Sequence, residues 1–125
     1  MSSMKLLVVD DSNIIRRKIE RSADTSCFDV VGLACNGVEA LTMLQSTQAS
    51  VVTMDLTMPE MDGVECVERM VKLKPDTRIL VVSALSDVET GILALEKGAR
   101  GFLCKPFSEQ QLNEALSELV EGLDV

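Results

Sequence analysis

The chain has no histidine, no tryptophan and no tyrosine, and only three phenylalanines among its 125 residues. Without histidine, a zinc site built from cysteine and histidine together is excluded. With so few aromatic side chains, there is also no platform on which nucleic-acid bases could stack. Lys and Arg number 12 against 20 Asp and Glu, which gives a net charge of −8. Because nucleic-acid phosphates repel an acidic chain, we expect no direct nucleic-acid binding.

The chain has few cysteines, and its hydrophobic runs are short. The four cysteines stand at positions 27, 35, 66 and 104, and none forms a C-x-x-C pair, so the spacing does not suit a cysteine-only metal site either. We expect four reduced thiols, mostly packed as small apolar side chains, as in cytosolic proteins. The apolar run Leu6–Val9 is too short for a signal peptide or a membrane span. We therefore expect a cytoplasmic domain without membrane contact.

Hydrophobic residues make up 46% of the chain and charged residues 26%, which is typical of one globular domain over residues 1–125. Several apolar runs are apolar on both faces, which indicates a parallel sheet covered by helices on each side. The runs predict five strands, over Lys5–Val9, Val30–Ala34, Val51–Met54, Ile79–Val82 and Gly101–Leu103.

Helix-period segments alternate with these strands. Capping patterns predict four helix starts, at Asn36, Asp62, Ser86 and Ser108. The first helix is expected near Ser12–Ala23, and Gly98 is expected to end the fourth helix. The alternation is (βα)5, an α/β fold that right-handed crossovers make a doubly wound three-layer sandwich. The chain stops shortly after the fifth helix, so we expect no output domain.

Apolar stripes predict which side of each helix faces the sheet. In the first helix, Ile15 and Ile19 are expected to be buried, opposite a basic side that carries Arg16, Arg17, Lys18 and Arg21. In the other helices the predicted stripes are Val38, Leu41 and Leu44; Val64, Val67 and Val71; Val88, Ile92 and Leu95; and Leu112, Ala115, Leu116 and Leu119.

Polar residues interrupt the apolar pattern at the strand ends. Asp10 and Asp11 follow the first strand, Asp55 the third, Ser83 the fourth and Lys105 the fifth. In a parallel α/β sheet the carboxyl ends of the strands converge on one crevice. The sequence therefore predicts one site with three carboxylates, a hydroxyl and an ammonium, which is able to hold a divalent cation and a phosphoryl group.

Each of these residues also has an ordinary explanation when it is taken alone. Asp11 could cap a helix, Asp55 or Ser83 could cap a loop, and Lys105 could simply be solvated. Together, three like charges in one pocket destabilise one another unless a cation sits among them. Mg²⁺ suits such a site because it prefers oxygen ligands and keeps several waters. One carboxylate could then attack phosphorus as a nucleophile.

Four segments carry a resemblance to a known family. They are Val8-Val9-Asp10-Asp11-Ser12, Met54-Asp55-Leu56-Thr57-Met58-Pro59-Glu60-Met61-Asp62-Gly63, Ser83-Ala84 and Gly101-Phe102-Leu103-Cys104-Lys105-Pro106. In this order and spacing they resemble the receiver domain of two-component response regulators. The resemblance implies the flavodoxin-like strand order 2-1-3-4-5.

By that resemblance Asp55 is the phospho-acceptor, and Asp10, Asp11, Asp55 and the backbone carbonyl of Thr57 bind Mg²⁺. Ser83 and Lys105 contact the phosphoryl group. Phe102 is the switch aromatic that moves with Ser83, and it stands where many relatives have Tyr, so it offers no hydroxyl.

The resemblance also implies the partners. A phosphohistidine on a sensor histidine kinase or a phosphotransfer protein donates the phosphoryl group, and a downstream protein target reads the fourth helix, fifth strand and fifth helix. The chain is then not an enzyme, and it catalyses only its own phosphotransfer and its own dephosphorylation. We expect the dephosphorylation to be slow, because the apolar Leu85 cannot position the attacking water. We expect a monomer that can dimerise on phosphorylation, in a chemotaxis-type or related pathway.

The residues alone leave three other functions open. A phosphatase of the haloacid dehalogenase type needs a second carboxylate where Thr57 stands, and a cap domain. A flavin carrier needs a phosphate-cradling loop where the Asp10-Asp11 pair would repel phosphate. A receiver that only docks would not need the five site residues. Within the receiver class, a stand-alone regulator and the receiver of a chemotaxis methylesterase both remain open.

Overall fold

The computed structural model describes residues 3–56, 62–84 and 88–121, in which strands and helices alternate along the chain. The strands are β1 (Met4–Val9), β2 (Phe28–Ala34), β3 (Val51–Asp55), β4 (Arg78–Ala84) and β5 (Gly101–Lys105). The helices are α1 (Asn13–Ser22), α2 (Gly37–Thr47), α3 (Gly63–Leu73), α4 (Val88–Glu96) and α5 (Glu109–Leu119).

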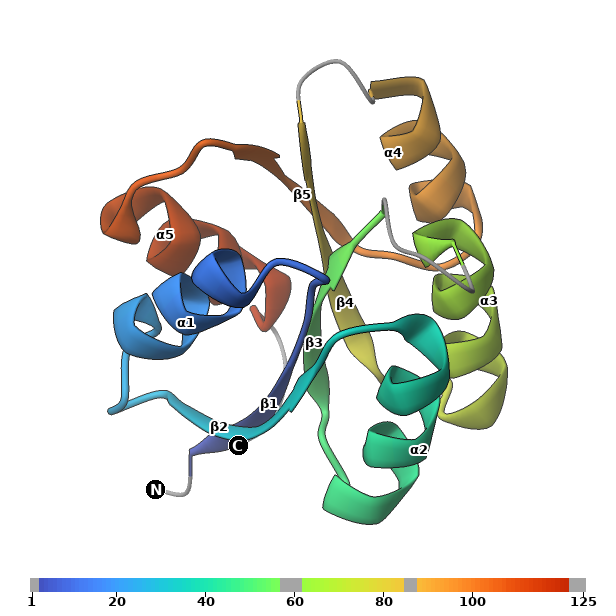
Figure 1. Ribbon diagram of the computed structural model, residues 1–125, viewed down its shortest axis with the longest axis horizontal. Helices are drawn as coiled ribbons and strands as arrows, with labels where there is room; N and C mark the ends of the chain where they lie inside the picture. Colours follow the sequence, from blue (N-terminus) through green and yellow to red (C-terminus); the bar gives the residue numbers. More distant parts are fainter. Residues whose placement is uncertain (1–2, 57–61, 85–87, 122–125) are drawn as a thin grey trace.

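All four strand pairings are parallel, and the sheet order is β2-β1-β3-β4-β5. The fold class and the strand order are therefore confirmed. Helices α1 and α5 cover one face of the sheet, and α2, α3 and α4 cover the other (Figure 1). The chain reverses its winding direction after β2, so the carboxyl ends of β1 and β3 lie side by side at the middle of the sheet.

Each face of the sheet has its own hydrophobic core, because side chains alternate along a strand. In β1, Leu7 and Val9 pack with α2, α3 and α4, whereas Leu6 and Val8 pack with α1 and α5. All four side chains are at most 1% exposed. Burial on both faces explains why the strand reads as an unbroken apolar run.

The helix ends follow their local sequence. The Asn36 and Asp62 side chains each accept the backbone N–H three residues on, at 2.8 Å, and Ser108 forms a reciprocal capping box with Gln111. Gly98 has a φ of 125° at the end of α4, and the two backbone hydrogen bonds of a Schellman motif surround it. The predicted start at Ser86 lies outside the described residues.

The predicted orientation of α4 is wrong. Its predicted core stripe, Val88, Ile92 and Leu95, is 43%, 54% and 41% exposed. The buried residues of α4 are Gly91 and Ala94. The helix turns its small residues to the sheet because the Phe102 ring from β5 fills the space beside Gly91.

Two smaller expectations also fail. Val38 at the start of α2 is 52% exposed, although Leu44 in the same predicted stripe is fully buried. The four cysteines are free, but they are not mostly packed as apolar side chains: Cys66 is buried, Cys35 and Cys104 are half-buried, and Cys27 is exposed. None of the helices in the described part of the chain has the length and apolar character needed to cross a bilayer.

Candidate functional site

The carboxyl ends of β1 and β3 bring three carboxylates together. Asp10 follows β1 directly, and Asp55 is the last residue of β3, where Val9 pairs with Met54. Asp10, Asp11 and Asp55 each offer one carboxylate oxygen, and these oxygens lie within 4.8 Å of one another. Asp10 is 1% and Asp55 4% exposed, whereas Asp11 is exposed. Of these three aspartates, Asp11 is thus the one that is exposed to solvent.

The backbone around Asp10 is held on several sides. Its N–H donates to the Ala34 carbonyl on β2, and its Oδ1 accepts the Ser12 N–H at 2.9 Å. The Arg16 guanidinium donates to the Asp10 carbonyl at 2.6 Å. Ser12, not Asp11, is the N-cap of α1, so capping does not account for the second carboxylate of the pair.

Lys105 reaches the carboxylates from β5. Its Nζ lies 3.1 Å from Asp10 Oδ2 and 3.5 Å from Asp55 Oδ1. Partial burial works to lower the pKa of the Lys105 ammonium, but the attraction of Asp10 and Asp55 outweighs it and raises the pKa above its ordinary value. The ammonium is therefore charged where an anion would bind. The peptide bond between Lys105 and Pro106, which the sequence left open, is cis.

The positive charge of Lys105 does not balance the negative charge of the three carboxylates. Asp10 Oδ2 is buried, and the cation that faces it among the described residues is the Lys105 ammonium, 3.1 Å away. Three carboxylates against one ammonium leave a net negative charge in a largely buried site. Oxygen donors so arranged fit a hard divalent cation such as Mg²⁺.

Ser83 and Phe102 lie on the same face of the sheet. Ser83 is 1% exposed and pairs with Cys104, two residues beyond Phe102 on β5. Because alternate residues share a face, Ser83, Cys104 and Phe102 all point toward the α4 side. A side chain on Gly91 of α4 would place its Cβ 2.1 Å from Cε2 of the Phe102 ring. Ser83 and Phe102 therefore both lie on the sheet face that α4 covers (Figure 1).

Helix α1 is also joined to the segment that follows β5, a contact that was not predicted from the sequence. Lys18 of α1 donates a hydrogen bond to the Phe107 carbonyl, and its Nζ lies 4.3 Å from the centroid of the Phe107 ring. These residues are 89 positions apart, and no spacing signal connects them. Lys18 and Arg16 both belong to the predicted basic side of α1, and both donate hydrogen bonds to backbone carbonyls, those of Phe107 and Asp10.

The model of the response regulator receiver domain matches residues 6–117. The chain belongs to this family. It is 36% identical over 115 residues to the chemotaxis protein CheY of Listeria monocytogenes, a match that covers 92% of this chain and 97% of that protein.

Solved structures agree with this assignment. The REC domain of AraT, a response regulator from Geobacillus stearothermophilus, superposes with a TM-score of 0.91 at 29% identity, covering 98% of this chain and 96% of that one. The CheX–CheY–BeF3–Mg²⁺ complex from Borrelia burgdorferi gives a TM-score of 0.86 at 26% identity, covering 93% and 88%. The receiver family thus accounts for the fold, and the dehalogenase and flavin-carrier alternatives fall away.

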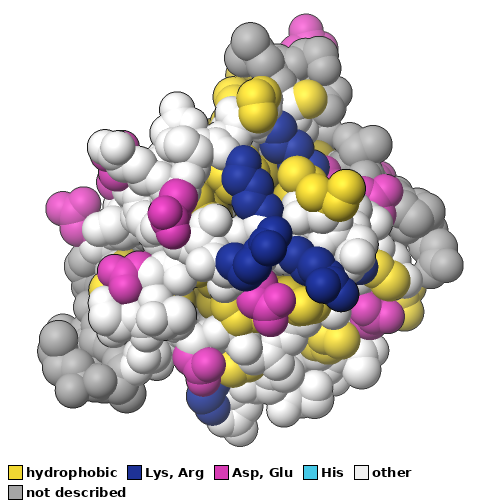
Figure 2. All heavy atoms as spheres, turned by 60° about the vertical axis from the view of Figure 1, so that its left-hand side comes forward, with side chains coloured by type: hydrophobic (Ala, Val, Ile, Leu, Met, Phe, Trp, Pro, Cys, Tyr) yellow, Lys and Arg dark blue, Asp and Glu magenta, His cyan; other side chains and the backbone are white. Residues whose placement is uncertain are grey.

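The receiver domain has an uneven surface charge. Helix α1 alone carries four of the 12 basic residues, and Figure 2 shows Lys and Arg side chains gathered in one band on the side of the molecule that α1 and α5 cover. Outside α1 the chain holds the other 19 acidic residues (20 less Glu20) against eight basic ones (12 less four).

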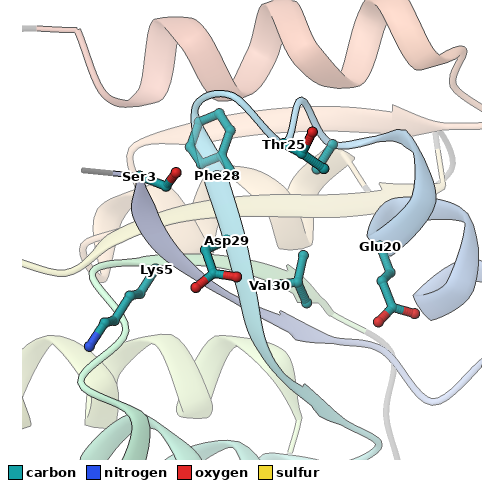
Figure 3. Close-up of a pocket in the computed structure, with 8 residues that line it drawn as sticks. Ser3, Lys5, Glu20, Thr25, Phe28, Asp29 and Val30 are labelled. Carbon is teal, nitrogen blue, oxygen red and sulfur yellow. The ribbon is translucent and has the colours of Figure 1, made fainter. Parts of the chain in front are cut away.

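A hollow of about 550 Å³ lies at the amino ends of β1 and β2, away from the cluster of Asp10, Asp11 and Asp55. Figure 3 shows the Lys5, Glu20 and Asp29 side chains around it, with the Phe28 ring at one end. Its charges are mixed and it has no link to the predicted site. The predicted ligand Thr57 and Leu85, to which slow dephosphorylation was attributed, lie outside the described residues.

Proposed function

We propose that this receiver domain is a phosphorylation-controlled switch in two-component signalling and that Asp55 is its phospho-acceptor. The observation that carries the proposal is the meeting of Asp10, Asp11 and Asp55 within 4.8 Å, with the Lys105 ammonium 3.5 Å from Asp55. The structural relative from Borrelia burgdorferi carries BeF3 and Mg²⁺, which is consistent with the same chemistry here.

In this proposal Asp10, Asp11 and Asp55 hold Mg²⁺, together with the carbonyl of Thr57. When bound, the ion would supply positive charge that offsets the negative charge of the phosphoryl group. An Asp55 carboxylate oxygen forms the bond to phosphorus as the P–N bond of a donor phosphohistidine breaks, and the imidazole leaves with the electron pair and takes up a proton. Lys105 holds the transferred oxygens by its charge, and the Ser83 hydroxyl donates to one of them.

The switch follows from where Ser83 points. When its hydroxyl turns toward the phosphoryl oxygens, the Phe102 ring gains room on the same face of the sheet and α4 shifts with it. The surface formed by α4, β5 and α5 then signals to a downstream protein. A near-complete change between two such conformations requires about 5.5 kcal/mol of differential stabilisation. Phosphate contributes by adding charge and acceptor oxygens at Asp55.

The remaining parts of the proposal concern context. The donor is a sensor histidine kinase or a phosphotransfer protein, and the domain acts in the cytoplasm. It is a monomer before phosphorylation and can dimerise after it. Apart from its own phosphotransfer it catalyses only its own slow dephosphorylation.

The test is phosphoryl uptake from acetyl phosphate, followed by intact-protein mass. Wild type is expected to gain one phosphoryl group in Mg²⁺ and none with a chelator present. Asp55→Asn is expected to gain none, whereas Asp29→Asn, an exposed carboxylate on β2, serves as the matched control and labels normally. Stoichiometric labelling of Asp55→Asn would refute the assignment, and absence of labelling in wild type would favour a receiver that only docks.

A further inference from the structure

Helix α4 presents apolar side chains to solvent. Seven large hydrophobic residues are exposed in the described part of the chain, and four of them, Val88, Ile92, Leu93 and Leu95, lie on this nine-residue helix. Exposed apolar residues that cluster on one element mark interaction sites, whereas single ones need no explanation. The cluster therefore calls for a partner.

Two adjoining hollows lie along α4 on the side of α3. The first, of about 470 Å³, lies between Val64 and Glu68 of α3 and Thr90 and Leu93 of α4. The second, of about 410 Å³, continues over α4 itself along Ile92 and Leu93. Because both hollows share Thr90 and Leu93, they form one groove, which we name the α3–α4 groove.

Among the described residues that line the α3–α4 groove, five are acidic and none is basic. The five that line it are Asp62, Glu65, Glu68, Glu89 and Glu96. Two have cationic neighbours: Glu65 pairs with Arg69 at 2.9 Å, and Glu68 with Lys97 at 3.3 Å. Both ion pairs are exposed to solvent, and exposed ion pairs contribute little to the stability of a protein. No ion pair joins Glu89 or Glu96 to a cation within residues 3–56, 62–84 and 88–121, so these two carboxylates are open to an incoming charge.

Position on the helix separates the α3–α4 groove from the other side of α4. Gly91 and Ala94 face the sheet, so Glu89 and Glu96 project away from it, and Thr90 and Leu93 lie on the α3 flank. Leu95 is as exposed as Leu93, at 41% against 43%, but lines neither hollow. The two leucines therefore report on opposite flanks of one helix.

We propose that the α3–α4 groove binds a cationic amphipathic helix of a partner protein. Its apolar stripe lies on Leu93, Ile92 and Val64, and its Lys or Arg side chains reach Glu89, Glu96 and Asp62. Charge complementarity selects this occupant: an acidic segment is repelled, and an apolar segment without cations leaves the carboxylates without compensation. The band of basic residues on the α1 side repels the same helix. The groove lies beyond the aspartate site and does not require phosphorylation of Asp55.

The probe is a fluorescent synthetic peptide of about four helical turns, in which leucines form one stripe and lysines fill the other positions. Two control peptides replace every lysine by glutamate or every leucine by serine. Anisotropy with the full chain, without a phosphoryl donor, should show saturable binding of the leucine–lysine peptide and none of the controls. Equal binding of the glutamate peptide would overturn the proposal.

Matched variants locate the binding site. Leu93→Gln should weaken binding about tenfold, as expected for an apolar contact at the centre of an interface, while Leu95→Gln leaves it unchanged. Glutamine is a good helix former, so both variants keep α4 intact, and circular dichroism checks this. Wild-type affinity in Leu93→Gln, or an equal loss in Leu95→Gln, would place the peptide elsewhere and overturn the proposal.

Charge variants test the electrostatic part. Glu89→Gln and Glu96→Gln should weaken binding several-fold at low salt and make it less salt-dependent, because they remove charges that attract the peptide. Glu118→Gln, an exposed carboxylate of α5, is the matched control and should bind as wild type does. If Glu118→Gln weakens binding as much as Glu89→Gln, the peptide is held by net charge alone and the α3–α4 groove is not its site.

Discussion

Helices α4 and α5 carry similar apolar stripes in sequence, yet they pack in opposite ways. In α5, Leu112 and Leu116 are fully buried and Leu119 is 3% exposed. In α4 the apolar residues face solvent, and Gly91 and Ala94 face the sheet. The difference shows that α5 is anchored by large side chains, whereas α4 rests on a small-residue face against the Phe102 ring.

The largest expected effect compares matched leucines on the two helices. Leu116→Ala on α5 removes a fully buried side chain and should cost about 2–5 kcal/mol of unfolding free energy. Leu95→Ala on α4 removes one that is 41% exposed and should cost less than about 1 kcal/mol. Urea unfolding of both variants measures the difference. Similar losses would mean that α4 is packed as tightly as α5.

A methyl group at Gly91 tests the contact that lets α4 approach the sheet. Alanine is favoured over glycine in a helix by about 1 kcal/mol, but here its Cβ would lie 2.1 Å from the Phe102 ring. We expect Gly91→Ala to destabilise the domain by about 1–2 kcal/mol net, because overpacking outweighs helix propensity.

A double-mutant cycle identifies the cause of that loss. In a Phe102→Leu background the ring is gone, so Gly91→Ala should cost much less, and the coupling appears as non-additivity in urea unfolding. If Gly91→Ala stabilises the domain in both backgrounds, Gly91 is an ordinary helix glycine and the contact with Phe102 does not constrain α4.

The start of α5 is fastened by its capping box, which gives a smaller effect. Ser108 Oγ accepts the Gln111 N–H at 3.1 Å, and Gln111 Oε1 accepts the Ser108 N–H at 2.8 Å. Ser108→Ala should lower the unfolding free energy by about 1 kcal/mol. Ser117→Ala, an exposed serine within the same helix, is the matched control and should change stability by less than about 0.5 kcal/mol. Equal losses of unfolding free energy in the two variants would show that the capping box does not stabilise α5.

The core beneath α2, α3 and α4 contains the ionisable thiol of Cys66. Ionisation of this thiol does not affect the stability of the domain at neutral pH. Burial raises the pKa of Cys66 to about 12. The pKa of a cysteine thiol in an unfolded chain is about 8.5. Between this pKa and that of folded Cys66 the folded state binds more protons than the unfolded state, so the unfolding free energy falls as the pH rises. A thiol reagent should therefore label exposed Cys27 but not Cys66 at pH values near 8, and labelling of Cys66 should require alkaline unfolding. Prompt labelling of Cys66 at neutral pH would contradict its burial.

Much of the fold is encoded locally, and for that reason it was predictable. Unbroken apolar runs such as Leu6–Val9 indicate strands buried on both faces, and capping residues such as Asn36 and Ser108 mark helix starts. The strand ends could be placed together from the general geometry of parallel sheets alone. The gathering of Asp10, Asp11 and Asp55 follows from that geometry.

What the sequence could not show depends on contacts between distant segments. The stripe of α4 has a helical period, but periodicity does not reveal that a ring from β5 fits against Gly91 and turns the small residues inward. The Lys18 tether to Phe107 likewise depends on two segments meeting in space. An interior glycine in a helix was the one available signal, since such a glycine often has a packing reason.

The most direct test of the account is the chemical identity of the phosphorylated residue. After treatment with acetyl phosphate and Mg²⁺, borohydride reduces an aspartyl phosphate to homoserine and releases phosphate, and peptide mass spectrometry locates the product. The account predicts homoserine at position 55 and unchanged aspartates at positions 10 and 11. Homoserine at either of those positions, or at none of the three, would contradict it.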